Sequence, residues 1–163
     1  VIKGNSITVR AEEKSQINSE VSGHIGTIAS GPWPAFPTDL MSVTIVAATQ
    51  NKGTIVFHEK MYEGRLFLTD KLMAMGANIV LCDPHRVVVT GSSSLQATQM
   101  SSPDVRAGLA LLIAALATKK GISTIHNIYQ IDRGYYQIES KLKRDLKAIM
   151  SDLKTYLKTH RYD

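Results

Sequence analysis

Two aspartates stand at the start of segments that have helical spacing and are apolar on nearly every face. Asp39 precedes the apolar run 40–50, and Asp104 precedes the run 105–118. A carboxylate in such a place can take a proton from a substrate hydroxyl. An acid in the first turn of a helix also complements the helix dipole, which is common without any function. The sequence leaves both explanations open and favours the structural one.

Three arginines accompany these acids. Arg65 and Arg133 each follow a predicted strand, and Arg106 lies two residues into the second apolar run. Guanidinium groups bind carboxylates and phosphates bidentately, and helix N-termini favour anions. Arg65 could instead pair with Glu63, and Arg133 with Asp132. The matched positions of three arginines nevertheless favour an anion-binding site.

No other pattern indicates chemistry. The five histidines lack metal-ligand spacing, and no glycine-rich phosphate loop or nucleophile elbow occurs, so we expect neither a metal nor a cofactor. Cys82 is the only cysteine, which excludes an intrachain disulfide. Because Cys82 ends the apolar run 79–82, it is predicted to be an inert, buried thiol.

Composition indicates one folded, soluble domain in a reducing compartment. The 163 residues are 44% hydrophobic and 20% charged, with a net charge of +5. This charge suits anionic ligands but is too evenly spread to predict a nucleic-acid partner. The longest apolar run, 109–117, is too short to span a membrane, and no signal peptide occurs, so a cytoplasmic location is expected. The chain begins with Val1 rather than Met, and we interpret it as a fragment or a processed product.

Periodicity and punctuation predict alternating strands and helices. Residues 1–30 should hold lead-in strands, and the prolines of 31–37 should enforce an extended path into the first apolar helix. The second apolar helix should begin with Ser102 as N-cap and Pro103 as its first residue. The predicted elements are strands 7–9 and 25–29, helix 39–50, strand 54–58, helix 66–75, strands 79–82, 86–90 and 95–100, helix 103–118, strand 122–126 and a long last helix that includes 142–157.

The order of these elements indicates an internal repeat. Asp39, Gly53 and Arg65 head a helix, a strand and a second helix, and equivalent residues recur 65 to 68 positions later at Asp104, Gly121 and Arg133. Two units, about 31–100 and 101–163, are therefore predicted. Since the first helix of each unit is apolar all round, the helices should lie between outer sheets.

The motifs at 34–39 (PAFPTD) and 131–135 (IDRGY), with three other motifs between them, resemble those of UDP-N-acetylglucosamine enolpyruvyl transferases. Order and spacing agree from about Trp33 to Leu142, and residues 71–72 and 81–86 are similar to the versions found in Bacteroidetes-type bacteria. The motifs are 34–39 (PAFPTD, like PxFPTD), 63–65 (EGR, like E-N/S-R), 75–77 (MGA), 103–107 (PDVRA, like D-[LIV]-R-A) and 131–135 (IDRGY, like I-[DE]-R-G-Y).

The resemblance implies an α/β fold, namely an inside-out α/β barrel of the enolpyruvyl transferase type. Such a barrel is built from repeated βαβαββ-like units with buried central helices. The chain would be the C-terminal part of the catalytic domain, with the N-terminal half absent. The implied reaction moves the enolpyruvyl group of phosphoenolpyruvate to the 3-hydroxyl of UDP-N-acetylglucosamine, without a cofactor, as the first committed step of peptidoglycan synthesis.

The resemblance also implies roles for single residues. Asp39 would contact the sugar 3-hydroxyl and act as its general base, and Met61 would contact the nucleotide-sugar through its backbone. Arg106 and Arg133 would hold phosphoenolpyruvate and the charge of a tetrahedral intermediate. Asp104 would handle a proton or orient these groups.

Arg65 would complete the set of substrate-binding residues.

Cys82 does not match the loop cysteine in the family's first half, where an essential lysine also lies, so the chain alone is expected to be inactive. The sequence after Leu142 lacks the family's glycine, and the last helix is predicted to run on. The alternatives are the related shikimate-phosphate transferase, which FPTD and DRGY disfavour, and a non-catalytic anion-binding or interaction module of the same fold.

Overall fold

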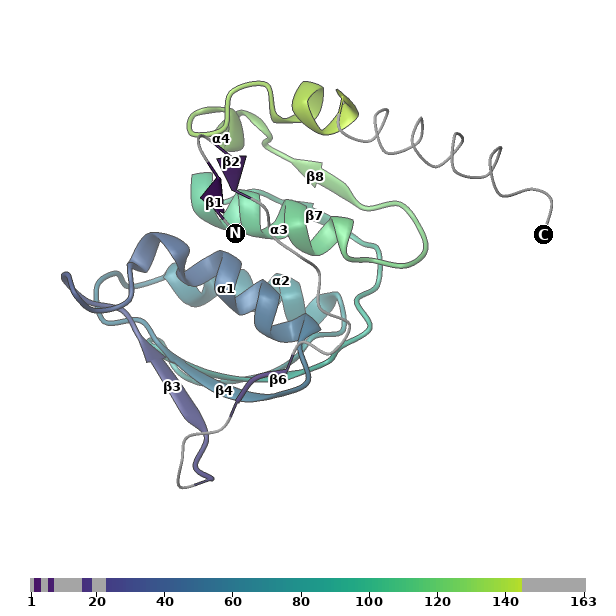
Figure 1. The fold of residues 1–163 in the computed structure, drawn as a ribbon. Helices are drawn as coiled ribbons and strands as arrows, with labels where there is room; N and C mark the ends of the chain where they lie inside the picture. Colours follow the sequence, from purple (N-terminus) through teal and green to yellow (C-terminus); the bar gives the residue numbers. More distant parts are fainter. Residues whose placement is uncertain (1, 4–5, 8–15, 19–22, 145–163) are drawn as a thin grey trace.

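The computed structural model describes residues 2–3, 6–7, 16–18 and 23–144 (Figure 1). Its strands are β1 (Ile2–Lys3), β2 (Ser6–Ile7), β3 (Gly26–Ala29), β4 (Gly53–His58), β5 (Asn78–Asp83), β6 (Arg86–Gly91), β7 (Gln99–Ser101) and β8 (Thr124–His126). Its helices are α1 (Thr38–Gln50), α2 (Leu68–Ala74), which follows a 3-10 turn at Arg65–Phe67, α3 (Val105–Leu116) and α4 (Tyr129–Asp132). Residues 138–144 are also helical.

Two strand–helix–strand connections organise these elements. The four-stranded sheet has the order β3-β4-β6-β5, in which β3 and β4 are parallel and the other neighbours antiparallel. Strands β7 and β8 form a second, parallel pair, and β1 and β2 form an antiparallel pair. Parallel neighbours need a long crossover, which α1 supplies between β3 and β4, and α3 between β7 and β8.

The helices lie between the sheets, as the sequence predicted. Figure 1 shows α1 and α2 covering one face of the four-stranded sheet, α3 beside them, and the β7–β8 pair beyond α3. Among the described residues, the sheets do not close into a barrel.

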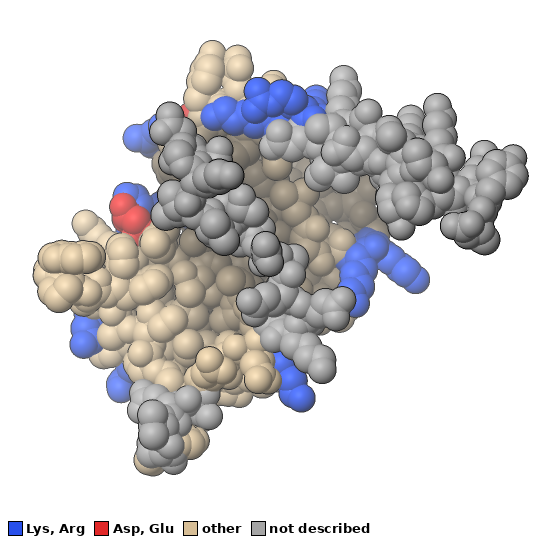
Figure 2. All heavy atoms as spheres, in the orientation of Figure 1, with Lys and Arg blue, Asp and Glu red and all other residues tan. Residues whose placement is uncertain are grey.

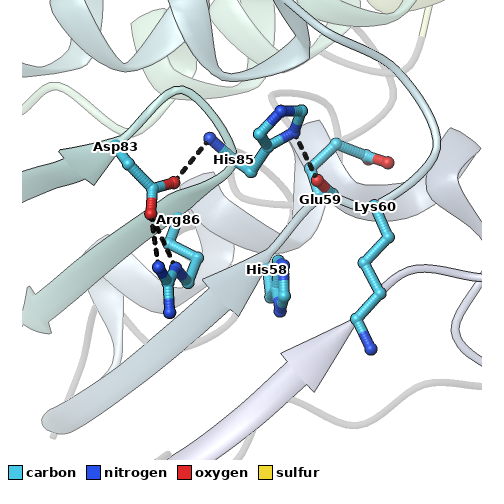
Figure 3. Close-up of a pocket in the computed structure, with 6 residues that line it drawn as sticks. All are labelled: His58, Glu59, Lys60, Asp83, His85 and Arg86. Carbon is cyan, nitrogen blue, oxygen red and sulfur yellow. Dashed lines mark hydrogen bonds and ion pairs between the residues drawn. The ribbon is translucent and has the colours of Figure 1, made fainter.

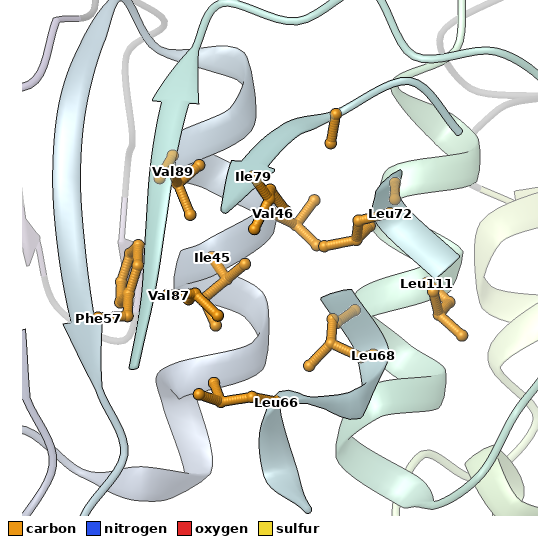
Figure 4. Close-up of a cluster of buried hydrophobic side chains, with 14 of the residues drawn as sticks. Ile45, Val46, Phe57, Leu66, Leu68, Leu72, Ile79, Val87, Val89 and Leu111 are labelled. Carbon is orange, nitrogen blue, oxygen red and sulfur yellow. The ribbon is translucent and has the colours of Figure 1, made fainter. Parts of the chain in front are cut away.

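The core is formed where α1 and α2 meet the inner face of the four-stranded sheet (Figure 4). Phe57 on β4 and Val87 and Val89 on β6 are fully buried, as are Ile45 and Val46 on α1. Alternate residues of a strand point to one face, which explains why 55 and 57 on β4, like 87 and 89 on β6, face the helices. Burying each such side chain contributes roughly 1.5–3 kcal/mol, so Phe57→Ala would remove much of the fold's stability.

The apolar helices are less buried than their sequences predicted. Leu40 on α1 is 50% exposed, and Ile113 and Leu116 on α3 are 39% and 56% exposed. In the described structure, α1 packs against the four-stranded sheet and α3, while α3 packs against α1, α2 and α4. One side of each helix therefore faces solvent.

The predicted burial of Cys82 is wrong. Cys82 is exposed, and so is Val80, while Ile79 on the same strand is buried. Strand β5 lies at the sheet edge, and helices cover only one face of this sheet. Val80 lies on the outer face, and Cys82 lies where the β5–β6 register shifts between Leu81 and Asp83, so the apolar run does not bury the thiol.

Helix α3 begins later than predicted. Its N-cap is Asp104 rather than Ser102, and its first residue is Val105. The Asp104 carboxylate accepts the backbone N–H groups of Arg106 and Ala107 at 2.8 and 2.9 Å. These charge-assisted bonds satisfy two of the otherwise unpaired amides of the first turn.

Three other predicted segments differ. The segment 31–37 is not extended but folds into a turn, in which Ala35 N–H donates to the Pro32 carbonyl at 2.9 Å and Gly31 N–H to that of Phe36 at 3.1 Å. The proline φ angle suits turns as well as extended chain. Strands β7 and β8 are shorter than the predicted 95–100 and 122–126. Of the predicted last helix, the part beyond 144 lies outside the described residues.

Candidate active site

The residues predicted to do chemistry gather at the carboxyl ends of parallel strands. Ligands of open α/β sheets bind there, because loops and helix N-termini converge at that edge. The residues in question are Asp39 after β3, Met61 and Arg65 after β4, Asp104 and Arg106 after β7, and Arg133 after β8.

Asp39 and Arg106 form a bidentate ion pair. Arg106 Nε lies 2.6 Å from Asp39 Oδ1, and Arg106 Nη2 donates to Asp39 Oδ2 at 2.7 Å. The hydrogen bond to Asp39 raises the pKa of Arg106, against a smaller lowering by burial. The side chains remain 57% and 41% exposed, so the pair contributes only about 0–1 kcal/mol to stability. Its geometric effect is larger, since it fastens the first turn of α1 to that of α3.

The two aspartates are therefore used differently. Asp104 Oδ1 caps α3 through two amides. Asp39 lies in the first turn of α1, whose N-cap is Pro37, and no side chain caps that helix by a hydrogen bond. Helix capping thus explains Asp104, whereas Asp39 is held by Arg106.

A hollow of about 440 Å³ brings Asp39, Arg106 and Arg133 together. Arg133 Nη1 donates to Gln130 Oε1 at 3.3 Å, rather than forming the Asp132 pair considered from the sequence. The whole lining is Asp39, Leu40, Val105, Arg106, Arg133, Gly134 and Tyr135. An acid and two arginines around one hollow can hold an anion beside a proton acceptor.

A close contact between α3 and α4 places Arg133. A Cβ on Gly108 would collide with Ser102 Oγ and would lie 2.6 Å from Ile131 Cγ1. Only glycine allows α4, and with it the Arg133 that follows, to approach α3 this closely.

A second hollow, of about 340 Å³, brings Arg65 to the other side of Arg106. In the described structure Arg65 does not pair with Glu63; its guanidinium lies 5.1 Å from the centroid of the Tyr62 ring. Gly64 has a φ of 76°, a left-handed conformation that glycine adopts without steric cost. The lining is Tyr62, Glu63, Gly64, Arg65, Asp104, Val105 and Arg106.

Met61 lines neither hollow. Its side chain is 43% exposed, and its backbone N–H donates to Glu59 Oε1 at 2.7 Å. The structure thus fixes the backbone at this position more firmly than the side chain.

Glu59, a fully buried carboxylate directly after β4, is not among the residues that the sequence predicted to be functional. Burial raises the pKa of Glu59, but hydrogen bonds from Ser30, Thr38 and the Met61 and Tyr62 amides outweigh it and lower the pKa below the ordinary value. The sequence offered one signal, a charged residue directly after an apolar strand. Because Lys60 comes next, however, the pair looks like two ordinary surface residues.

Outside these two hollows, the face drawn in Figure 2 carries no continuous basic patch, and the described residues include no metal-ligand group or membrane-spanning helix. Figure 2 shows basic side chains at several separate places on one face rather than as a single continuous patch. Within the described ranges, no group of three histidine, cysteine or acidic side chains could hold a metal ion. No helix among those residues has both the length and the apolar character needed to cross a membrane.

Comparison with known proteins identifies the family. The family described as EPSP synthase (3-phosphoshikimate 1-carboxyvinyltransferase) matches residues 2–142. The chain belongs to this family. The resemblance inferred from the sequence motifs is also confirmed, because the chain is similar to proteins named UDP-N-acetylglucosamine 1-carboxyvinyltransferase.

Two such relatives show how far the similarity extends. The protein of Borreliella burgdorferi is 56% identical over 137 residues, which are 84% of this chain and 32% of that protein. The protein of Bacteroides fragilis is 54% identical over 143 residues, which are 86% of this chain and 33% of that protein. The chain therefore spans about a third of the length of these relatives.

A solved structure supports the fold. The enolpyruvyl transferase NikO from Streptomyces tendae matches 73% of this chain and 27% of its own, with a TM-score of 0.65 and 24% identity. At this identity the match shows the fold alone: the chain has the mixed α/β fold of enolpyruvyl transferases.

Proposed function

We propose that the protein carrying this chain is an enolpyruvyl transferase that joins phosphoenolpyruvate to the 3-hydroxyl of UDP-N-acetylglucosamine and releases phosphate. The observation that carries the proposal is the Asp39–Arg106 pair beside Arg133 in one hollow. Two points support the substrate assignment: the names of relatives at 50–56% identity, and the FPTD and DRGY motifs, which disfavour the shikimate-phosphate alternative.

In this proposal Asp39 is the general base for the sugar hydroxyl. Arg106 and Arg133 hold the carboxylate and phosphate of phosphoenolpyruvate and the charge of the tetrahedral intermediate, an electrostatic task suited to fixed guanidinium groups. Arg65 faces the same anion from the second hollow. Asp104 orients Arg106 through its backbone, and the Met61 backbone contacts the nucleotide-sugar.

We further propose that the reaction is the first committed step of peptidoglycan synthesis and takes place in the cytoplasm. It would thereby serve cell-wall biogenesis, cell shape and cell division. The partners would be the two substrates and the part of the enzyme that lies outside these 163 residues.

The 163-residue chain alone is expected not to turn over. The repeat units proposed for it, about 31–100 and 101–163, supply three acids and three arginines around hollows that are open to solvent, whereas this chemistry needs groups that enclose the substrates. Phosphate release from the two substrates, measured with the purified chain, checks this. Turnover by the chain alone would show that the described site is sufficient.

Asp39→Asn in the whole protein tests the assignment of the base. An amide cannot take the hydroxyl proton, so kcat should fall by about a hundredfold or more. The exposed pair contributes little to stability, so the melting temperature should change little. Asp70→Asn, at an exposed first-turn position of α2, is the matched control. Near wild-type turnover of Asp39→Asn would contradict the general-base assignment and favour the non-catalytic, anion-binding alternative.

A further inference from the structure

Glu59 is a buried carboxylate that no role proposed above uses. It is 0% exposed, and an ion in such a place is strongly disfavoured unless several donors surround it. Oε1 accepts from Ser30 Oγ at 2.6 Å, from Met61 N at 2.7 Å and from Tyr62 N at 3.3 Å. Oε2 accepts from Thr38 Oγ1 at 2.7 Å.

These donors come from the segments that carry the proposed site. Ser30 directly follows β3, and Thr38 is the first residue of α1 and the neighbour of Asp39. The Met61–Tyr62 backbone begins the loop that leads to the second hollow. One carboxylate therefore links the segment that carries Asp39 to the Met61 backbone, the two groups proposed to contact the nucleotide-sugar.

Contacts with His85, between β5 and β6, fix the backbone of Glu59. Its backbone N–H donates to the His85 carbonyl at 2.8 Å, and its own carbonyl lies 3.1 Å from His85 Nδ1. The backbone N–H of His85 in turn donates to Asp83 Oδ1 at 2.8 Å. Figure 3 shows the contacts of His85 with Asp83 and with the Glu59 carbonyl, and the Glu59 carboxylate pointing away from the Asp83–Arg86 pair. The carboxylate is thus a fixed point rather than a mobile side chain.

We propose that Glu59 is a positioning residue, which sets Asp39, through Thr38, against the Met61 backbone so that both face one substrate. The inference rests on the proposed function and deepens it. Hydrogen bonds to a charged acceptor are shorter and about twice as strong as neutral ones, so Glu59 can define the direction of the first turn of α1. A displacement of only about 1 Å at a reacting group can lower a rate by about a hundredfold.

Thr38 variants of the whole protein separate positioning from stability. Thr38→Val removes the donor to Oε2 and should lower kcat by at least about tenfold, while Thr38→Ser keeps the hydroxyl and should restore most of the activity. Thr49→Val is the control, because Thr49 lies in the same helix and donates to the Val46 carbonyl at 2.7 Å. It should change kcat less than about twofold. Equal kcat values for Thr38→Val and Thr49→Val would overturn the inference.

A double-variant cycle tests the route through Asp39. If Thr38 acts by placing the Asp39 carboxylate, then Thr38→Val should cause no further loss of kcat in an Asp39→Asn background. A loss as large as in the wild-type background would place the effect elsewhere and contradict the proposal.

Hydrogen exchange makes the test independent of the proposed function. In the whole protein, Glu59→Gln should speed exchange of the Met61 and Tyr62 amides by about tenfold or more, because their charged acceptor is lost. Glu139→Gln, at an exposed position, should leave those amides unchanged. If wild-type protein fails to release phosphate from the two substrates, the proposed function fails, and the exchange result alone decides the structural inference. Unchanged exchange in Glu59→Gln overturns it.

Discussion

The Glu59 carboxylate should make the stability of this fold depend on acid. The pKa of Glu59 is lowered in the folded protein, because four hydrogen bonds outweigh the opposing effect of burial. In the unfolded chain a glutamate has a pKa of about 4.3. A lowered folded-state pKa means that the unfolded chain takes up the proton more readily. The contribution of Glu59 is therefore complete above about pH 4.3 and is lost as the pH falls through the folded-state pKa.

The number of hydrogen bonds to Glu59 sets how much unfolding free energy the Glu59→Gln variant should lose. A bond to a charged group contributes about 1.5–3 kcal/mol and a neutral one about 0.5–1.5, so loss of charge weakens each bond by about 1 kcal/mol. In Glu59→Gln, the oxygen can keep the donors at Oε1, and the Thr38 hydroxyl can turn to accept from the amide. Removing the charge also relieves its desolvation cost, so a net loss of about 2 kcal/mol at neutral pH is expected. That loss corresponds to roughly 4–8 °C in melting temperature.

Urea denaturation of the 163-residue chain at about pH 7, 5, 4 and 3 measures this effect. The difference in unfolding free energy between wild type and Glu59→Gln should be about 2 kcal/mol at pH 7 and 5, and should shrink as the pH approaches 3. Glu139→Gln, at an exposed position, should show a difference near zero throughout. A Glu59→Gln difference that stays constant from pH 7 to 3 would refute the reasoning, since it could not come from the charge.

Three further predictions concern single side chains. Asp104→Asn should destabilise the fold by at most about 1 kcal/mol, because asparagine caps helices nearly as well, whereas Asp104→Ala should lose about 1–2; equal losses in urea denaturation would contradict the capping role. Cys82 is exposed, so a maleimide should label the folded protein within about tenfold of the unfolded rate by mass spectrometry, and strong protection would show the thiol to be covered. Ser42 Oγ is buried without a hydrogen-bond partner among the described residues, so Ser42→Ala should leave the melting temperature unchanged or raise it; a clear fall would reveal a partner.

Local patterns in the sequence predicted most of the fold. Short apolar runs bounded by turn residues predicted β4 and β6, and the long apolar runs predicted α1 and α3 within about two residues, which is the usual uncertainty of helix ends. Gly76 predicted that a helix ends just before it, and α2 ends there at Ala74. These elements follow from interactions between near neighbours along the chain, and such interactions leave a periodic signal.

Interactions between distant segments left no such signal. Glu59 bonds to Ser30 and Thr38 across 29 and 21 residues, and its position directly after an apolar strand does not show that it has so many donors. Cys82 was misplaced for a related reason: a short apolar run does not say which face of an edge strand the helices cover. The pairing of Arg106 with Asp39, rather than of Arg65 or Arg133 with a sequence neighbour, also depends on the packing of α1 against α3.

The structure separates the two aspartates that the local sequence pattern could not distinguish. Asp104 points one carboxylate oxygen at two backbone amides, which is sufficient reason for an acid at that position. Asp39 makes no such bond; both its oxygens are held by Arg106, and more than half of its side chain is exposed at 57%. An anion that enters the hollow competes with Asp39 for the same guanidinium. In the proposed reaction, binding of phosphoenolpyruvate would therefore draw Arg106 toward its charge and release the Asp39 carboxylate to accept the sugar hydroxyl. One ion pair would then keep the base in place before the substrates arrive and free it when they do.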